Sequence, residues 1–133
     1  MKSSLYKEQF RREMILFGEN IRKLDPYYFC KIIDITAQQS GTKCWVIADC
    51  RRLFDIKYFS DKYPERTITV RIECPLYIRS NRGFEFECGI DDAESECGLD
   101  NYKSWHHVIK NADHFDPEFN NLVDKIKKLC FIN

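Results

Sequence analysis

The chain has 133 residues, a length typical of a single domain, and 44% of them are hydrophobic, which is enough to bury a core. Its 21 basic residues balance its 21 acidic residues, so the net charge is zero. A general nucleic-acid binder or a membrane-surface binder needs a net basic face, and the balance argues against both classes.

Seven cysteines are present, and no two of them have the C-x-x-C spacing. The sequence shows no signal-peptide pattern and no long apolar run. We therefore expect a reduced, cytosolic protein whose thiols serve as small core residues, without a disulfide framework or a zinc site.

Residues 4–24 are predicted to form an amphipathic helix, because apolar side chains recur at steps of three and four. They are Phe10, Met14, Phe17, Ile21 and Leu24. A second stripe of the same helix contains Lys7, Arg11, Gly18 and Arg22. This cationic stripe could line a binding cleft or could be a solvated basic face, and the spacing leaves both interpretations open.

The next helix is predicted to begin at Asp25-Pro26, an Asp cap followed by proline at the first helical position. It is expected to end at Ser40-Gly41. Residues 44–48 then form a short apolar run, which is typical of a strand buried on both faces of a sheet. The run stops at Asp49, and Arg51-Arg52 follow almost directly.

The rest of the chain alternates predicted helices with predicted strands. We expect helices over 53–63 and from Asp116-Pro117 onward, strands over 67–72 and 105–110, a loop or lid over 74–86, and a short helix after residue 90. This alternation predicts the α/β class, with a parallel sheet flanked by helices. Ligands of such sheets bind beyond the carboxyl ends of the strands, where Arg51, Arg52 and Asn111 are expected.

Arginines gather in particular segments although the net charge is zero. The candidates for binding small phosphorylated anions are Lys7, Arg11, Arg22, Arg51, Arg52, Arg71, Arg79 and Arg82. A guanidinium presents a planar fork that matches phosphate oxygens and keeps its proton. Phosphoryl transfer depends on positioning and cationic stabilisation, so this composition favours that chemistry.

Residues 91–101, here called the acidic run, hold five carboxylates in eleven residues. By itself such a run is typical of a solvated acidic helix face. Asp91 and Asp92 could position Mg²⁺ through water, but a helix cap favoured by the helix dipole is the stronger interpretation. His106 and His107 fall in a strand pattern and are interpreted as structural.

These pieces, taken in order, resemble the animal-type phosphomevalonate kinases, which have the nucleoside-monophosphate-kinase-like P-loop fold. The resemblance covers residue 5 to about residue 111. It is carried by Tyr6-Lys7-Glu8, Phe10-Arg11, Gly18-Glu19, Arg22, Asp25-Pro26, Phe29-Cys30, Trp45-Val46, Asp49-Cys50-Arg51-Arg52, Asp55-Ile56, Thr69-Val70-Arg71, Arg79, Arg82, the acidic run and Val108-Ile109-Lys110-Asn111.

The resemblance implies a single kinase domain over 1–133, with a lid at about 74–88. It implies ATP-dependent phosphorylation of 5-phosphomevalonate to 5-diphosphomevalonate, with Mg²⁺, in the mevalonate pathway of isoprenoid and sterol (cholesterol) biosynthesis. It further implies a cytosolic protein, with a peroxisomal form also open, that is monomeric at full length and binds neither nucleic acid nor membrane.

The resemblance also implies roles for individual residues. The substrate-side group would be Lys7, Arg11, Arg22, Arg51, Arg52 and Asn111, the catalytic group Arg51, Arg52 and Arg71, and the nucleotide-side or lid group Arg71, Arg79 and Arg82. No residue is assigned as a metal ligand. Two local departures are Lys31, where the family tends to have arginine, and Ala112, where a histidine is usual.

A larger departure concerns the family's first strand and its Gly-rich loop of the Gly-Lys-x-x-Ser-Gly-Lys-Asp kind, which hold the ATP phosphates. This sequence has five glycines and none lies in such a loop. We therefore expect little or no kinase activity from this exact chain, a sheet without its central strand, and marginal stability. The alternative is a truncated, non-catalytic isoform that only binds phosphorylated anions.

Overall fold

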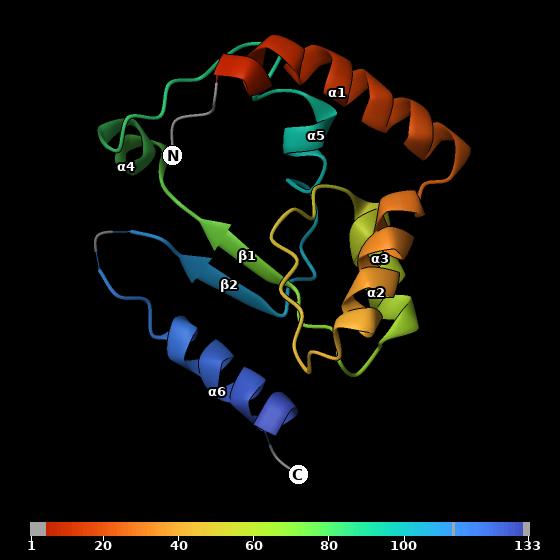
Figure 1. Cartoon of the computed structure of the whole chain (residues 1–133). Coiled ribbons are helices and arrows are strands. Elements are labelled where there is room, and N and C mark those ends of the chain that lie inside the picture. Colours follow the sequence, from red (N-terminus) through yellow and green to blue (C-terminus); the bar gives the residue numbers. More distant parts are fainter. Residues whose placement is uncertain (1–4, 113, 132–133) are drawn as a thin grey trace. The chain divides into compact units, whose positions relative to one another are not determined.

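The computed structural model describes residues 5–112 and 114–131, and the side chains of 5–8 and 131 are not described. The chain forms two compact units, Met1–Thr42 and Lys43–Asn133, here called unit 1 and unit 2. Each unit is described by itself, with the element labels of Figure 1. The expectation of one kinase domain over the whole chain stays a prediction.

Unit 1 contains two helices, α1 (Leu5–Leu24) and α2 (Tyr28–Ser40). The predicted first helix is confirmed. Asp25 caps a turn before α2, because its Oδ1 accepts the N–H of Tyr27 at 3.0 Å, and the helix itself begins three residues after the predicted aspartate. The predicted end is confirmed, since Gly41 follows α2 with φ of 66°, the left-handed conformation that glycine adopts without strain.

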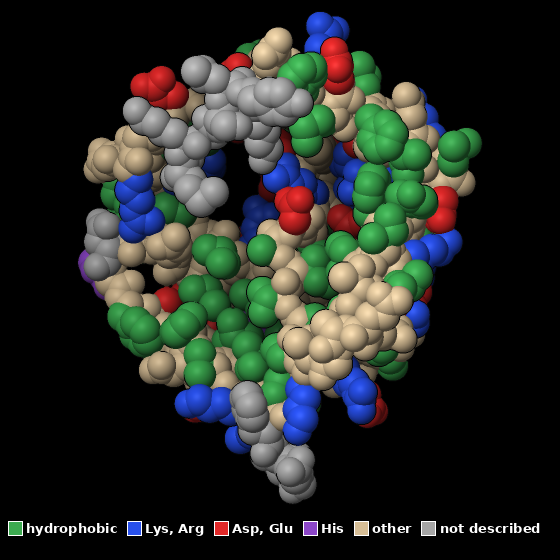
Figure 2. Space-filling view, in the orientation of Figure 1, with side chains coloured by type: hydrophobic (Ala, Val, Ile, Leu, Met, Phe, Trp, Pro, Cys, Tyr) green, Lys and Arg blue, Asp and Glu red, His purple; other side chains and the backbone are tan. Residues whose placement is uncertain are grey.

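The predicted apolar face of α1 is largely exposed. Met14, Phe17 and Leu24 all lie among the exposed large hydrophobic residues, and Phe17 is 64% exposed. Figure 2 shows hydrophobic side chains spread widely over one face of the molecule. An apolar stripe of this size favours association with other apolar surface. The expectation of marginal stability stays a prediction.

Unit 2 contains a small α/β core. Its elements are α3 (Leu53–Lys62), β1 (Val70–Glu73), α4 (Leu76–Asn81), α5 (Glu94–Cys97), β2 (His107–Lys110) and α6 (Glu118–Phe131). β1 and β2 pair in parallel, with Val70 opposite His107 and Glu73 opposite Lys110, and α6 packs against β2 (Figure 1). The predicted α/β class and the parallel pairing are therefore confirmed.

The prediction of a strand over residues 44–48 is wrong. Residues 44–47 have no regular secondary structure, Ala48 lies in a turn, and none of them pairs with a strand in the part of the chain that the structure describes. Trp45 and Ile47 are half-buried, whereas Val46 is 87% exposed, so the run is not buried on both faces either. A strand needs a hydrogen-bonded neighbour, and the described sheet contains only β1 and β2.

The segment predicted as a loop or lid over 74–86 is partly helical. α4 begins after Pro75, whose φ of −55° suits a helix start, and Ile78 is buried. Gly83 follows the helix with φ of 87° and donates its N–H to the Ser80 carbonyl at 2.9 Å. The buried isoleucine therefore anchors the middle of this segment.

Candidate arginine site

The backbone of Arg51 and Arg52 is fixed by one carboxylate at the start of α3. Asp55 Oδ2 accepts the N–H of Arg51 at 3.0 Å and the N–H of Arg52 at 3.1 Å. Asp55 is the third residue of α3 and is buried, so this is the carboxylate of a capping box. The start of α3 therefore fixes the backbone positions from which both arginine side chains project.

The Arg51 guanidinium lies between two carboxylates. Its Nε donates to Asp49 Oδ1 at 2.6 Å, and its Nη1 forms an ion pair with Glu96 of α5. The hydrogen bond to Asp49 raises the pKa of Arg51 above its usual value, and the charges of Asp49 and Glu96 raise it further against the effect of burial. This guanidinium stays charged at any physiological pH.

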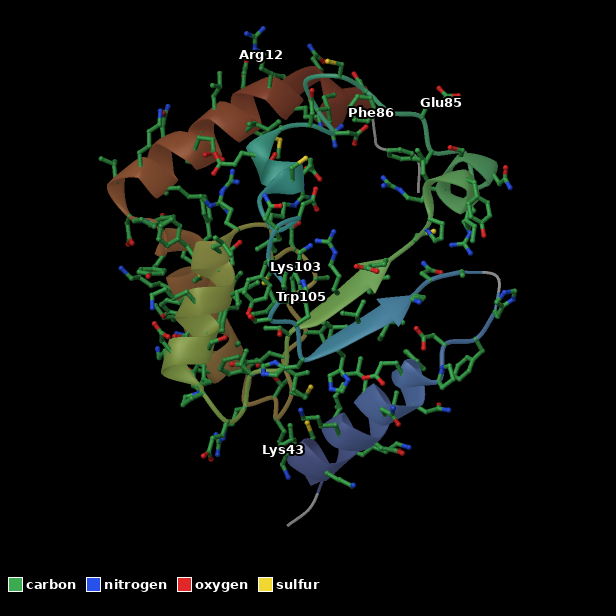
Figure 3. All side chains as sticks on the ribbon, turned by 180° about the vertical axis from the view of Figure 1, so that it is seen from behind. Arg12, Lys43, Glu85, Phe86, Lys103 and Trp105 are labelled. Atoms are coloured by element: carbon green, nitrogen blue, oxygen red, sulfur yellow. The ribbon has the colours of Figure 1, made fainter. Side chains whose placement is uncertain are left out.

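Arg71 is held by the end of the acidic run. Its Nη2 pairs with Asp100 Oδ1 at 2.9 Å, and its Nη1 donates to the Leu99 carbonyl at 3.4 Å. The guanidinium also lies 5.9 Å from the centre of the Trp105 ring, whose position beside the start of β2 can be followed in Figure 3. Stacking over an aromatic ring limits the orientations of an arginine fork.

Gly98 lets the acidic run approach Arg51 closely. A Cβ atom at this position would lie 2.9 Å from the Arg51 carbonyl oxygen, 2.8 Å from the Glu94 carbonyl oxygen and 3.9 Å from Arg52 Nη1. Residues 96–100 thus pair with Arg51 and Arg71. With Arg52, which neighbours Arg51 in the chain, these two arginines are here called the arginine cluster. These are the three arginines that the resemblance assigns to catalysis.

A second group lies beyond the carboxyl ends of the two strands. Arg82 Nη1 donates to Asn111 Oδ1 at 3.1 Å and to the Asn111 carbonyl at 3.4 Å. Asn111 in turn donates its N–H to the Glu73 carbonyl at 2.7 Å, which extends the sheet ladder by one bond. Arg79 lies elsewhere in this region, with its guanidinium 3.7 Å from the centre of the Phe84 ring.

The basic residues of α1 belong to unit 1, so their grouping with the arginine cluster stays a prediction. The Arg22 guanidinium lies 4.6 Å from the centre of the Phe29 ring on α2. A Cβ atom at Gly18 would lie 3.6 Å from Arg22 Nη1, so the cationic stripe packs along its own helix. Arg11 is half-buried, and the Lys7 side chain lies outside the described residues.

Asp91 and Asp92 cap a turn rather than the short helix. Asp91 Oδ2 accepts the N–H of Glu87 at 2.8 Å, and Asp92 Oδ1 accepts the N–H of Gly89 at 2.6 Å. α5 begins two residues later without a side-chain cap, so the helix-cap interpretation is wrong in position although capping is their role. Among the residues described, no three His, Cys, Asp or Glu side chains are placed to hold a metal ion.

The two histidines have structural partners. His106 Nδ1 accepts the N–H of Thr69 at 3.0 Å, and His107 Nδ1 lies 2.5 Å from Glu118 Oε1 on α6. The first bond joins the residue before β2 to the residue before β1, and the second joins β2 to α6. Both contacts agree with the structural interpretation of these side chains.

Sequence reasoning missed the carboxylates of the site. Asp49, Asp55, Glu96 and Asp100 each contact an arginine of the cluster, yet none was a candidate. One signal was present, because the arginine-bearing segment runs directly into the acidic run. The sequence could not predict which carboxylate pairs with which arginine, because the paired residues are between 2 and 45 residues apart in the chain.

The expected place of Arg51 and Arg52 at a strand end is wrong, because residues 44–48 form no strand, whereas Asn111 does follow β2. Guanidinium groups gathered in one place are typical of proteins that bind small phosphorylated anions. The sequence profile of the phosphomevalonate kinase family matches residues 1–65. The phosphomevalonate kinase of Drosophila melanogaster is 36% identical over an alignment of 126 residues, and the alignment covers 92% of this chain and 67% of that protein. The chain belongs to the phosphomevalonate kinase family.

A kinase of this family is a phosphotransferase, and family membership implies ATP and small phosphorylated molecules as ligands. Within the described ranges, none of the helices is long and apolar enough to cross a membrane.

Proposed function

We propose that this chain carries the acceptor side of a phosphomevalonate kinase, which transfers a phosphoryl group from ATP to 5-phosphomevalonate in the mevalonate route to isoprenoids and sterols. The observation that carries the proposal is the convergence of Arg51 and Arg71 on residues 96–100. Family membership supports it.

The cluster has donors to offer a phosphate. Arg51 uses Nε and Nη1 for its carboxylates, and Arg71 uses Nη1 and Nη2 for its contacts with the acidic run. Each guanidinium has five N–H donors, so hydrogens remain on both arginines after these bonds form. Charge-assisted hydrogen bonds to phosphate oxygens contribute about 1.5–3 kcal/mol each, which is enough to select a phosphorylated acceptor.

The nucleotide side of the proposal is assigned to Arg79 and Arg82, which lie on and just after α4. Mg²⁺ usually binds through one or two carboxylates together with substrate phosphates, so no cage of protein ligands is required. Asn111, hydrogen-bonded to Arg82 at 3.1 Å, would then lie between the nucleotide side and the acceptor side. The cofactors of the proposed reaction are ATP and Mg²⁺.

The test is binding of 5-phosphomevalonate to the purified chain by isothermal titration calorimetry, with a matched pair of variants. Arg51→Lys keeps the charge but loses the fork, and we expect affinity to fall about tenfold. Arg66→Lys is the control, because Arg66 is exposed and lies outside the cluster, and we expect a change below about twofold. No saturable binding by the unmodified chain, or equal losses in both variants, would contradict the proposal.

We further propose that the 133-residue chain supplied with ATP and Mg²⁺ forms little diphosphomevalonate. None of its five glycines lies in a Gly-rich phosphate loop, and loss of one set of transition-state donors costs about 10²–10³ in rate. Binding without turnover would favour the non-catalytic anion-binding alternative for this exact chain. Turnover at an ordinary kinase rate would contradict both this expectation and that alternative.

A further inference from the structure

We propose that Glu96 and Asp100 are positioning residues, which hold the Arg51 and Arg71 guanidinium groups in place for binding phosphate. This inference rests on the proposed function. Glu96 pairs with Arg51, and Asp100 pairs with Arg71 at 2.9 Å, so one short segment orients arginines from two distant parts of unit 2. The carboxylates of the acidic run would thus orient the arginines of a cationic binding site, rather than form a solvated helix face.

The segment is built to hold this geometry. Leu99, between the two carboxylates, is 7% exposed and anchors the backbone. Gly98 has no side chain and lets the backbone approach the Arg51 carbonyl more closely than any other residue would allow. Leu99 also accepts a hydrogen bond from Arg71 through its carbonyl at 3.4 Å, so backbone and carboxylate hold the same guanidinium.

The two ion pairs are poor stabilisers of the fold. The Arg51 and Glu96 side chains are 44% and 35% exposed, and Arg71 and Asp100 are 30% and 55% exposed. Pairs this accessible to water contribute little to stability. Their stronger effect is to restrict two flexible arginines before a ligand arrives, because a preordered side chain loses less conformational entropy on binding.

The carboxylates also carry a cost, because they repel an incoming phosphate. Positioning and repulsion predict opposite results when a carboxylate is replaced by its amide. If positioning dominates, Glu96→Gln and Asp100→Asn weaken phosphate binding. If repulsion dominates, the same variants strengthen it, so the sign of the change decides between the two effects.

The experiment measures binding of 5-phosphomevalonate and, separately, of inorganic pyrophosphate to the purified chain. We expect Glu96→Gln and Asp100→Asn each to weaken binding of both probes about five- to tenfold. Glu94→Gln is the matched control, since Glu94 lies two residues from Glu96 on α5 and makes no described side-chain ion pair. We expect less than a twofold change in the control, and urea midpoints close to that of the unmodified chain in all three variants.

A spectroscopic readout separates orientation from general stability. The Nη–H resonances of Arg51 and Arg71 in ¹⁵N spectra report how strongly each guanidinium is restrained, because Glu96 accepts from Arg51 Nη1 and Asp100 accepts from Arg71 Nη2. We expect Glu96→Gln to broaden or shift the Arg51 resonance and to leave Arg71 unchanged, and Asp100→Asn to do the reverse. Unchanged resonances, or binding equal to or tighter than that of the unmodified chain, would overturn the positioning role.

The two probes keep this inference distinct from the proposed function. If 5-phosphomevalonate fails to bind while pyrophosphate binds and responds to the variants as expected, the acceptor assignment falls and the positioning role stands. If both probes bind and neither responds to Glu96→Gln or Asp100→Asn, the positioning role falls and the acceptor assignment stands.

Discussion

The acidic run and the apolar run at 44–48 are both short and strongly patterned, yet only one of them reaches its predicted structure. The acidic run forms α5 and finds partners for Glu96 and Asp100 within unit 2. The apolar run stays without a strand partner among the described residues, and Val46 points into solvent. The difference teaches that the sequence pattern of a segment predicts its structure only where the rest of the chain supplies the partners that this structure requires.

The two runs differ in the kind of partner they require. A carboxylate is satisfied by one guanidinium or by one or two backbone N–H groups, which a nearby turn or helix start can provide. An internal strand of a parallel sheet needs a neighbour along each edge over its whole length. In the structure, Trp45 instead packs its ring against Tyr63, with ring centres 5.6 Å apart.

The largest predicted difference between the runs is in side-chain deletion. Leu99→Ala should lower the free energy of unfolding by about 2–4 kcal/mol, because Leu99 is buried and its loss leaves a cavity under the acidic run. Val46→Ala should change it by less than about 0.5 kcal/mol, because Val46 is exposed. Urea unfolding of both variants checks this, and equal losses would mean that the two runs are equally packed.

A smaller effect is expected at the close approach of the acidic run to Arg51. Gly98→Ala places a Cβ atom 2.8–2.9 Å from two carbonyl oxygens, so the backbone has to shift, at a cost of about 1–3 kcal/mol. Ser104→Ala, at an exposed position beyond the run, serves as the control. Thermal melts of both variants would test the contact, and an unchanged Gly98→Ala melting temperature would contradict it.

A third effect, seen only at alkaline pH, concerns Cys50, which lies between the apolar run and the arginine cluster in the sequence. Burial, followed by the negative charges of Asp55 and Asp49, raises the pKa of the Cys50 thiol from 9.0 to about 11. The folded chain therefore keeps this proton where the unfolded chain loses it, and stability should fall as the pH rises from about 9 through about 11.

The same pKa predicts slow alkylation of Cys50. At pH 8 its thiolate fraction is about 100-fold below that of an unperturbed thiol, so iodoacetamide should label exposed Cys88 first. Mass spectrometry of the labelled chain identifies the order. Cys50 labelling as fast as Cys88 would mean that its surroundings are more open than described.

Helices could be predicted from the sequence where local sequence signals determine them. The periodicity of α1, the Ile56–Phe59 spacing of α3 and the Asp116-Pro117 start of α6 each predicted a helix that the structure contains. β1 and β2 were also predicted, each starting too early, and β1 ends one residue later than predicted. α4 was not, because a six-residue helix after Pro75 depends on the burial of Ile78, which is a tertiary contact.

The candidate site was readable in part for a similar reason. Arg51, Arg52 and Arg71 were among eight basic candidates in the sequence, and their grouping as catalytic residues came from the family resemblance. Their carboxylate partners did not stand out, because ion pairing depends on which segments meet in space. Asp49 was within two residues of Arg51, and its contact could have been proposed from spacing.

The parallel pairing of β1 with β2 leaves β1 with two unlike edges. Successive residues of a strand direct their backbone N–H and C=O groups to opposite sides, and the bonds of Thr69 and Glu73 to β2 define the inner side. The N–H groups of Val70 and Ile72 therefore face outward. Deuterium should enter these two amides long before those of Arg71 and Glu73, so isotope exchange would vary with a period of two along a single strand.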